Sequence, residues 1–397
     1  MCEKYTLITE QDMKNIIWGA TLMGGGGGGS ITSGTMLMEK FKESHTGSDM
    51  TVKLYEPEHM ADGSYASATA GMGAPAAIVG VDFSKYAANA SALLKEIAER
   101  AGKKLMYNIP VELGGFSTFF PFLLSLQSKE EGVEMPVVDA DGAGRAVPAL
   151  ETLLLNVNGC VTSPLALAND KNDKISVELA DPYNAPLAEK IGRDICSEFG
   201  NMVGISGWLV SKEDVRTKIC TGTITLCKKI GEVLRTSNAL DSDMFEELAR
   251  QQLVDTKVIC KGTITDITTE THGGFDYGTL TVQSDRYPDH VYCIRFQNEN
   301  LLLQKKLGEN EFEDLMTVPD LTCMYCIDPA GAEGVIPRMP LSNADAKKGM
   351  KIAVGVIKVD PKWFMTEEKW WNVWNECMET IGYTCGHLGF DHVEPQE

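Results

Sequence analysis

The sequence lacks an excess of basic charge. Its 397 residues contain 36 Lys and Arg against 56 Asp and Glu, which gives a formal net charge of -20. A nucleic-acid-binding surface needs positive charge to meet the phosphate backbone, so nucleic acid is not an expected partner. The chain also has no uninterrupted apolar run of roughly 18 residues and no apolar segment at its N-terminus, so a membrane is not an expected partner either. We expect a cytoplasmic protein.

Motifs for metal and thiol chemistry are also scarce. The 11 cysteines are an odd number without disulfide-like spacing, which indicates reduced thiols. The six histidines form neither a His-x-His nor a His-Glu-x-x-His pattern. Cys323 and Cys326 have the spacing of a zinc pair, but no second pair exists, so core positions are favoured. The sequence identifies no cofactor and leaves a divalent metal ion such as zinc, held by residues distant in sequence, as an alternative.

Glycine is abundant at one place, where six occur in a row at positions 24–29. Glycine loses more backbone freedom on folding than any other residue, so such a run costs stability unless bare backbone is needed there. The alternative is a flexible linker, but linkers are usually longer, richer in serine and not flanked by residues such as Leu22, Met23 and Ile31. We therefore expect this segment to form part of a binding site.

The glycine run fits neither common nucleotide motif. A Walker loop needs a Lys before its Ser or Thr, whereas Ser30 follows the glycines directly. The dinucleotide fingerprint follows a strand, whereas residues 13–20 have helical spacing behind a capping box of Thr9 and Asp12. Successive N–H groups of bare backbone can still converge on an anion or a polar ring. The predicted ligand-binding residues of this loop are Gly25, Gly26, Gly27, Gly28, Gly29 and Ser30.

Strands and helices are expected to alternate in the first part of the chain. Apolar runs predict strands at 52–55, 76–79, 104–111 and 136–138, and helical periodicity predicts helices at 87–100, 117–126 and 149–156. This alternation is typical of a parallel α/β layer.

The second part of the chain becomes rich in strands. The patterns predict a strand at 175–178, helices at 186–199, 213–234 and 367–379, and strands at 202–210, 258–260, 264–267, 279–282, 291–296, 321–327 and 352–359. The length of the chain favours two domains. We predict an α/β protein with a parallel α/β domain and glycine-rich loops at 1–165, followed by a β-rich α+β domain at 166–397.

Acidic residues follow two of the predicted strands, where ligands collect in α/β sheets. Glu112 precedes the glycine pair at 114–115, and Asp139 and Asp141 precede Arg145. If the strand persists, Asp139 and Asp141 point to one face and could serve general acid/base chemistry or a divalent cation. The alternative is that one acid caps the following helix and the other pairs with Arg145.

Asn298 and Asn300 form the strongest polar group of the second part. They follow an apolar strand and would be carried into a partly buried place on one face of the strand, with Glu299 on the other. Buried amides require hydrogen-bond partners, which a cyclic ureide offers as N–H and C=O groups. The alternative is a turn in which the asparagines bond their own backbone.

These segments together resemble the S-methyl-thiohydantoin desulfurase family, which is associated with hydantoinase-type proteins. The resemblance spans nearly the whole chain, because its motifs occur in order at 19–29, 112–115, 138–148, 296–301, 318–321 and 388–391. It implies a hydrolase that acts on thiohydantoins or hydantoin-like cyclic amides. Water would attack the sulfur-bearing ring carbon, and a thiol would leave.

For this reaction we assign roles to the candidate residues as a hypothesis. Glu112, Asp139 or Asp141 would act as general base or bind a metal that activates water. Loop amides with Arg145 would hold the developing negative charge, and Asn298 and Asn300 would orient the ring. Two further predicted substrate-binding residues are Gly114 and Gly115. The competing interpretation is a nucleotide- or phosphate-ligand-binding protein that uses the loop at 24–29. The sequence leaves open whether the protein is a homo-oligomer.

Overall fold

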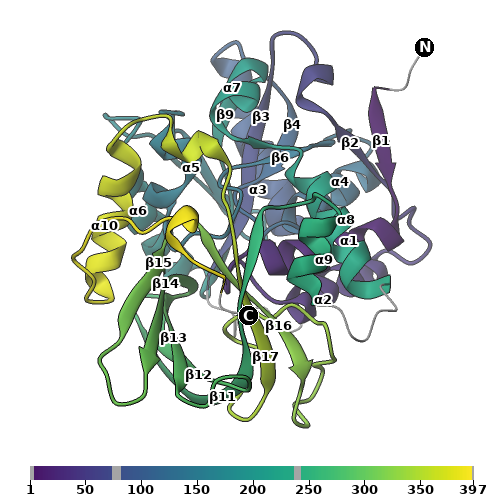
Figure 1. The fold of residues 1–397 in the computed structure, drawn as a ribbon. Coiled ribbons are helices and arrows are strands. Elements are labelled where there is room, and N and C mark those ends of the chain that lie inside the picture. The colour runs from purple at the N-terminus through teal and green to yellow at the C-terminus, as the bar shows by residue number, and fades with distance from the viewer. Residues whose placement is uncertain (1–3, 74–81, 237–242, 396–397) are drawn as a thin grey trace.

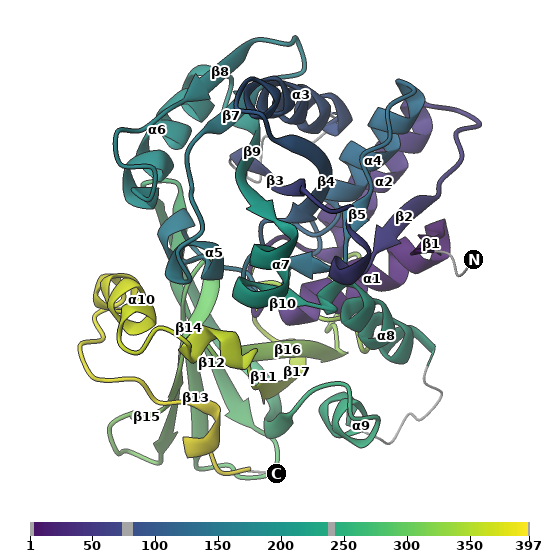
Figure 2. The same cartoon turned by 90° about the horizontal axis from the view of Figure 1, so that it is seen from above.

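The computed structural model describes residues 4–73, 82–236 and 243–395. They form two units, a mixed sheet with helices and a curled antiparallel sheet, which lie one above the other in Figure 1 and are seen from above in Figure 2. Their buried side chains form one continuous core. The predicted α/β class with a β-rich C-terminal domain is confirmed. In these three ranges no helix combines the length and apolarity needed to cross a membrane.

The first sheet has eight strands, and only its centre is parallel. Their order is β1 (Tyr5–Ile8), β2 (Val52–Tyr55), β5 (Val137–Val138), β4 (Lys104–Pro110), β3 (Ser64–Gly73), β9 (Met202–Ser211), β7 (Leu165–Ala168) and β8 (Lys174–Val177). The pairs from β2 through β5 and β4 to β3 are parallel, and the others are antiparallel. The sheet is therefore mixed, and it continues across residue 165. The strand predicted at 76–79 lies outside the described residues.

Eight α-helices accompany this sheet among the described residues. They are α1 (Glu10–Met23), α2 (Ile31–Ser44), α3 (Ser84–Arg100), α4 (Phe120–Glu130), α5 (Leu154–Val157), α6 (Ala185–Glu198), α7 (Lys212–Lys218) and α8 (Thr223–Thr236). The predicted capping box is confirmed, since Thr9 and Asp12 exchange side-chain to backbone hydrogen bonds at the start of α1. The helix predicted at 149–156 is reduced to a 3-10 turn, η3 (Leu150–Thr152), and α5.

The prediction of one helix at 213–234 was wrong. Between α7 and α8 the chain forms the short strand β10 (Cys220–Thr221), which pairs with β6 (Ala140–Asp141). Gly222 follows with φ +74°, which is not a helical conformation. Gly222 N donates to Asp139 O at 2.8 Å. A new helix, α8, then begins and contacts β6 of this two-stranded sheet.

The second sheet is entirely antiparallel. Its order is β15 (Glu313–Thr317), β14 (Glu299–Leu307), β13 (His290–Gln297), β12 (Phe275–Ser284), β11 (Thr256–His272), β17 (Lys351–Ile357) and β16 (Leu321–Asp328). The strands predicted at 258–260 and 264–267 are parts of the single long strand β11, which α9 (Met244–Arg250) contacts.

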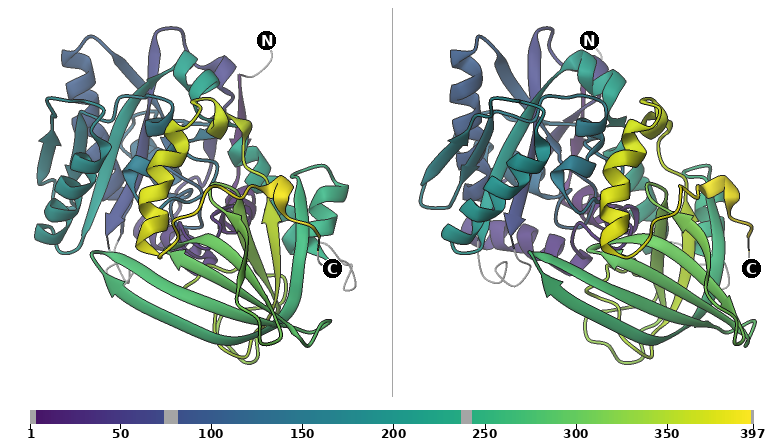
Figure 3. Two further views of the ribbon diagram at one scale, coloured as in Figure 1. Left: turned by 60° about the vertical axis from the view of Figure 1, so that its left-hand side comes forward. Right: turned by 90° about the vertical axis from the view of Figure 1, so that its left-hand side faces the viewer.

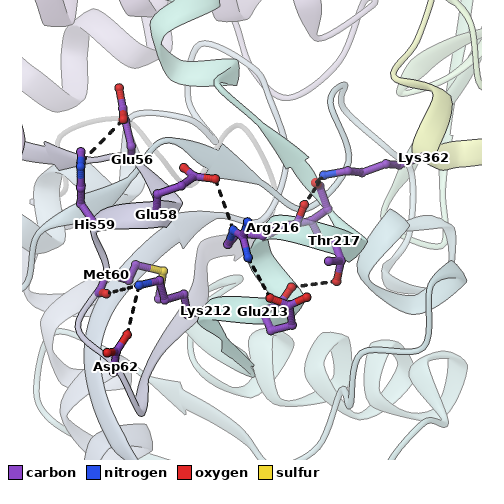
Figure 4. Close-up of polar contacts among 11 residues, drawn as sticks. Glu56, Glu58, His59, Met60, Asp62, Lys212, Glu213, Arg216, Thr217 and Lys362 are labelled. Atoms are coloured by element: carbon purple, nitrogen blue, oxygen red, sulfur yellow. Dashed lines mark hydrogen bonds and ion pairs between the residues drawn. The ribbon is translucent and has the colours of Figure 1, made fainter.

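The C-terminal segment returns from the second sheet to the first unit (Figure 3). It contains η4 (Pro361–Phe364) and α10 (Lys369–Thr380). Trp363 Nε1 donates to Ala143 O at 2.9 Å, and Lys362 Nζ donates to Arg216 O at 2.8 Å. Figure 4 shows the second of these contacts beside the surface ion pairs of Arg216. The last segment thus ties the two units together.

Helices α1 and α8 cross with their backbones in close contact. A Cβ atom on Gly19 would overlap with the carbonyl oxygen of Cys227, and one on Gly231 would overlap with that of Asn15. The two glycines therefore set the distance between the two helices.

We predict that Gly19→Ala lowers the free energy of unfolding by about 1 to 3 kcal/mol, because the added methyl group forces the helices apart. Chemical denaturation followed by circular dichroism measures this change. Gly386→Ala is the control, since its Cβ atom would meet nothing within 4 Å. Equal stability of the two variants would contradict the close crossing.

Candidate functional site

The six-glycine loop lies at the junction of the two units. Gly25 O accepts a hydrogen bond from Asn300 N at 2.8 Å, and Gly26 O accepts one from Asn343 N at 2.8 Å, both from the second unit. Gly28 O accepts from Phe116 N at 3.1 Å, which belongs to the first unit. The loop is therefore packed from both sides and is not a flexible linker.

The surroundings of the loop leave no room for side chains. A Cβ atom on Gly26 would lie 2.7 Å from Asn300 Oδ1. One on Gly27 would overlap with the Glu299 carboxyl group, and one on Gly28 would overlap with Leu113 O. Gly26 and Gly28 also have φ values of +95° and +68°, which favour glycine. The run of glycines is explained by close approach on several sides at once.

The second glycine-rich loop meets the first, as the sequence predicted. Gly115 N donates to Gly29 O at 2.9 Å, and a Cβ atom on Gly114 would overlap with Gly28 O. Ser30 has a structural partner of its own, because its Oγ accepts from Ser33 N at 3.1 Å and caps α2. The structure brings these two predicted loops together as one backbone surface.

Glu112 stands at the edge of this surface and is partly exposed. Its Oε1 accepts from Ser117 Oγ at 2.8 Å, and its Oε2 accepts from Val147 N at 2.8 Å. Burial raises the pKa of the Glu112 carboxyl to about 7, although both donors act to lower it, and the negative charge of Asp141 adds to the rise. A carboxyl group with this pKa can take up and release protons near neutral pH.

Arg145 is fully buried beneath the junction. Its Nη1 donates to Pro319 O at 2.7 Å and to Asp320 O at 3.1 Å, and its Nη2 donates to Asn300 O at 3.2 Å. The guanidinium group also lies 5.3 Å from the ring of Trp374 on α10. Arg145 therefore binds carbonyl groups of the second unit and contributes a positive charge to the junction.

Asp139 and Asp141 are both buried and accept hydrogen bonds from backbone amides. Asp139 Oδ1 accepts from Ile224 N at 2.8 Å and from Thr225 N at 3.1 Å, so its carboxylate caps α8. Asp141 Oδ1 accepts from Ala143 N at 2.8 Å, within its own turn. Burial raises the pKa of Asp139, and it raises that of Asp141 to about 7. The strand does not persist as the same-face argument required, because β5 ends before Asp139 and β6 pairs with β10.

The structure separates Asn298 from Asn300. Asn298 has φ +56°, and its Oδ1 accepts from Asp276 N of β12 at 2.9 Å and not from its own backbone as in the turn alternative. Asn300 faces the glycine loop, and its Nδ2 donates to Thr322 O at 2.9 Å. Of the two asparagines, only Asn300 lies beside the candidate site.

Sequence reasoning missed two residues that complete the site. Glu299 is only 3% exposed and lies against Gly27, and Asn343 contacts Gly26. Three oxygens here, Glu299 Oε2, Asn300 Oδ1 and Asn343 Oδ1, are buried without a hydrogen-bond partner. The sequence placed Glu299 on the face opposite the asparagines, but the positive φ of Asn298 breaks the alternation. Asn343 lies in a loop with no local signal.

The chemistry of these side chains does not fit zinc. Within the described ranges, no three His, Cys, Asp or Glu side chains form a group that could hold a metal ion. The junction supplies two glutamates, two amides and an arginine. The reaction proposed below uses no metal ion.

Family models cover most of the chain. The N-terminal domain model of the S-Me-THD-like type matches residues 11–178, and the C-terminal domain model matches residues 183–370. The chain belongs to the S-Me-THD-like family. This confirms the resemblance, and the family description is consistent with a thiohydantoin-related function of an enzyme. Both glycine-rich loops lie in the N-terminal match, whereas Glu299, Asn300 and Asn343 lie in the C-terminal one.

The fold has a counterpart among solved structures. A crystal structure of a protein from Chromobacterium violaceum has a TM-score of 0.79, with 22% sequence identity over 97% of this chain and 100% of that chain. This similarity shows the shared fold. A comparison with curated proteins gave no match.

We predict that Asp139→Ala lowers the free energy of unfolding by about 1 to 2 kcal/mol, because the α8 N-terminus loses its acceptor. Thermal or urea unfolding measures the change. Asp62→Ala is the matched control, since the Asp62 side chain is 98% exposed. A stability equal to that of the control would remove the capping role.

Proposed function

We propose that this protein is a hydrolase that removes sulfur from S-methyl thiohydantoins or attacks related hydantoin-like cyclic amides. The observation that carries the proposal is the carboxyl group of Glu112. It is partly exposed, its pKa is raised to about 7, and it lies where the two glycine-rich loops meet. The family description supports the substrate class.

Glu112 acts as the general base in this proposal. Ser117 and the amide of Val147 fix the orientation of its carboxylate. Glu112 takes a proton from water, which attacks the sulfur-bearing ring carbon. Asp139 and Asp141 are weaker candidates for the base because both are buried, whereas Glu112 is partly exposed.

The unpaired oxygens around Gly26 and Gly27 suit the ring of the substrate. Buried acceptors without partners require donors, and a cyclic amide brings ring N–H groups. Asn300 Oδ1 and Asn343 Oδ1 accept these N–H groups. The Gly25 and Gly27 amides already donate to Leu22 O and Gly24 O, so the charge of Arg145 stabilises the negative charge that develops on the ring during attack.

We expect Glu112→Gln to lower kcat for thiol release by at least about 100-fold, because the amide cannot take the proton of water. In the wild-type protein kcat/KM should fall below about pH 7, since the base must be ionised and its folded-state pKa is about 7. A thiol-detection assay on an S-methyl thiohydantoin measures both. Glu43→Gln, a change at an exposed glutamate, is the control. Near-wild-type turnover of Glu112→Gln would remove Glu112 from the mechanism.

A phosphate ligand is disfavoured by the same geometry. Two glutamates border the glycine loop, and the Gly25 and Gly27 amides, which a phosphate would need as donors, already donate to Leu22 O and Gly24 O. Thermal shift should therefore show a higher Tm with hydantoins and thiohydantoins and no change with ATP or NAD, because only a ligand that binds the native state stabilises it. Stabilisation by the nucleotides alone would support the phosphate-binding alternative and contradict the hydrolase.

A further inference from the structure

Glu299 is a second carboxyl group on the same glycine loop, contributed by the other unit. It is the first residue of β14, and its side chain lies against Gly27. Glu112 approaches from the first unit, where its neighbour Leu113 contacts the adjacent Gly28. The two carboxyl groups are close enough that the charge of Glu112 raises the pKa of Glu299. Glu299 and the residue that follows Glu112 therefore contact neighbouring glycines of the same loop.

The environment of Glu299 favours the protonated carboxyl group. Burial is the main cause that raises its pKa well above the usual range, and the charge of Glu112 acts in the same direction. Arg145 acts in the opposite direction, and so do the backbone amides of Glu299 and Gly28. The hydrogen bonds of the Arg145 side chain go to the carbonyl groups of Ala146, Asn300, Pro319 and Asp320. The third titratable neighbour is Cys377 on α10, whose thiol pKa is raised to about 12, mainly by burial.

A purely structural role leaves one feature of Glu299 unexplained. Its Oε2 is buried and has no hydrogen-bond partner, which costs free energy in the folded protein. Asn300 Oδ1, which also faces the loop, is unpaired as well. A planar ring that brings a nitrogen acceptor beside an N–H donor would pair both oxygens at once if Glu299 carries the proton.

We infer that Glu299 is the general acid of the reaction and works with Glu112 as a pair of carboxyl groups contributed by the two units. The inference rests on the proposed function. It assigns the substrate a more specific class, a cyclic S-alkyl isothiourea with an unprotonated ring nitrogen next to the sulfur-bearing carbon.

The proton transfers balance over two steps. In the first, the oxygen of water bonds to the ring carbon, Glu112 takes a proton from this water, and Glu299 gives its proton to the ring nitrogen as the C=N π bond opens. In the second, the carbon–sulfur bond breaks and the carbonyl group forms. Glu299 takes the hydroxyl proton, and Glu112 gives its proton to the departing thiolate. The products are the hydantoin and the free thiol, and both glutamates return to their starting states.

The test is the pH dependence of thiol release by wild-type protein, Glu299→Gln and Glu151→Gln. Glu151 is the control, because burial also raises its pKa and it lies in η3, outside the junction. Wild-type kcat/KM should fall at low pH, where Glu112 is protonated, and at high pH, where Glu299 is ionised. We expect Glu299→Gln to lower kcat at least about 100-fold and to lose the decline at high pH, while Glu151→Gln keeps the wild-type profile.

A second substrate separates proton donation from positioning. An N-methylated, cationic form of the same ring needs no proton from an acid, so Glu299→Gln should lose less than about tenfold on it. Glu299→Asp keeps a carboxyl group and should retain the decline at high pH. An equal loss on both substrates, or a decline at high pH that persists in Glu299→Gln, would overturn the acid role while the hydrolase proposal stands. Absence of thiol release by the wild-type protein would overturn both.

Discussion

The structure depends on one constraint, the close approach of backbone to backbone at the junction. Residues 26–29 touch the loop at 113–116 on one side and residues 299–300 and Asn343 on the other, at distances that leave no space for a Cβ atom. Such contacts require glycine, so the same feature explains the sequence and holds the two units together. Arg145, from the first unit, adds to these contacts because its guanidinium group donates hydrogen bonds to carbonyl groups of the second unit.

The acidic residues near this junction differ in how many hydrogen bonds their carboxyl oxygens accept. Asp139 receives three hydrogen bonds from residues 224 and 225, two from amides and one from a hydroxyl, and this makes it a cap. Glu112 receives one donor on each oxygen and stays partly exposed. Glu299 keeps one oxygen without a partner. Burial raises the pKa of all three carboxyl groups. The number of hydrogen-bond donors around each carboxyl group therefore distinguishes the structural acid from those that can exchange protons.

Local patterns predicted much of the fold, and long-range contacts account for what they missed. The helical spacing and capping box before the glycines correctly predicted α1, and amphipathic spacing predicted α6. The helix expected at 213–234 failed because Asp139, far away in sequence, caps a new helix start. For the site, glycine loops and Glu112 were visible in the sequence. Glu299 was assigned to the wrong face and Asn343 was missed, because a positive φ and tertiary packing determine their positions.

The return of the C-terminal segment has a consequence for biosynthesis. Trp363 bonds Ala143, and Trp374 covers Arg145, so residues made late in translation complete the environment of residues made early. Domains fold from the N-terminus as the chain emerges from the ribosome. The guanidinium group of Arg145 therefore stays without its Trp374 contact until the last helix has emerged. The nascent chain thus completes the surroundings of Arg145 only after the synthesis of α10.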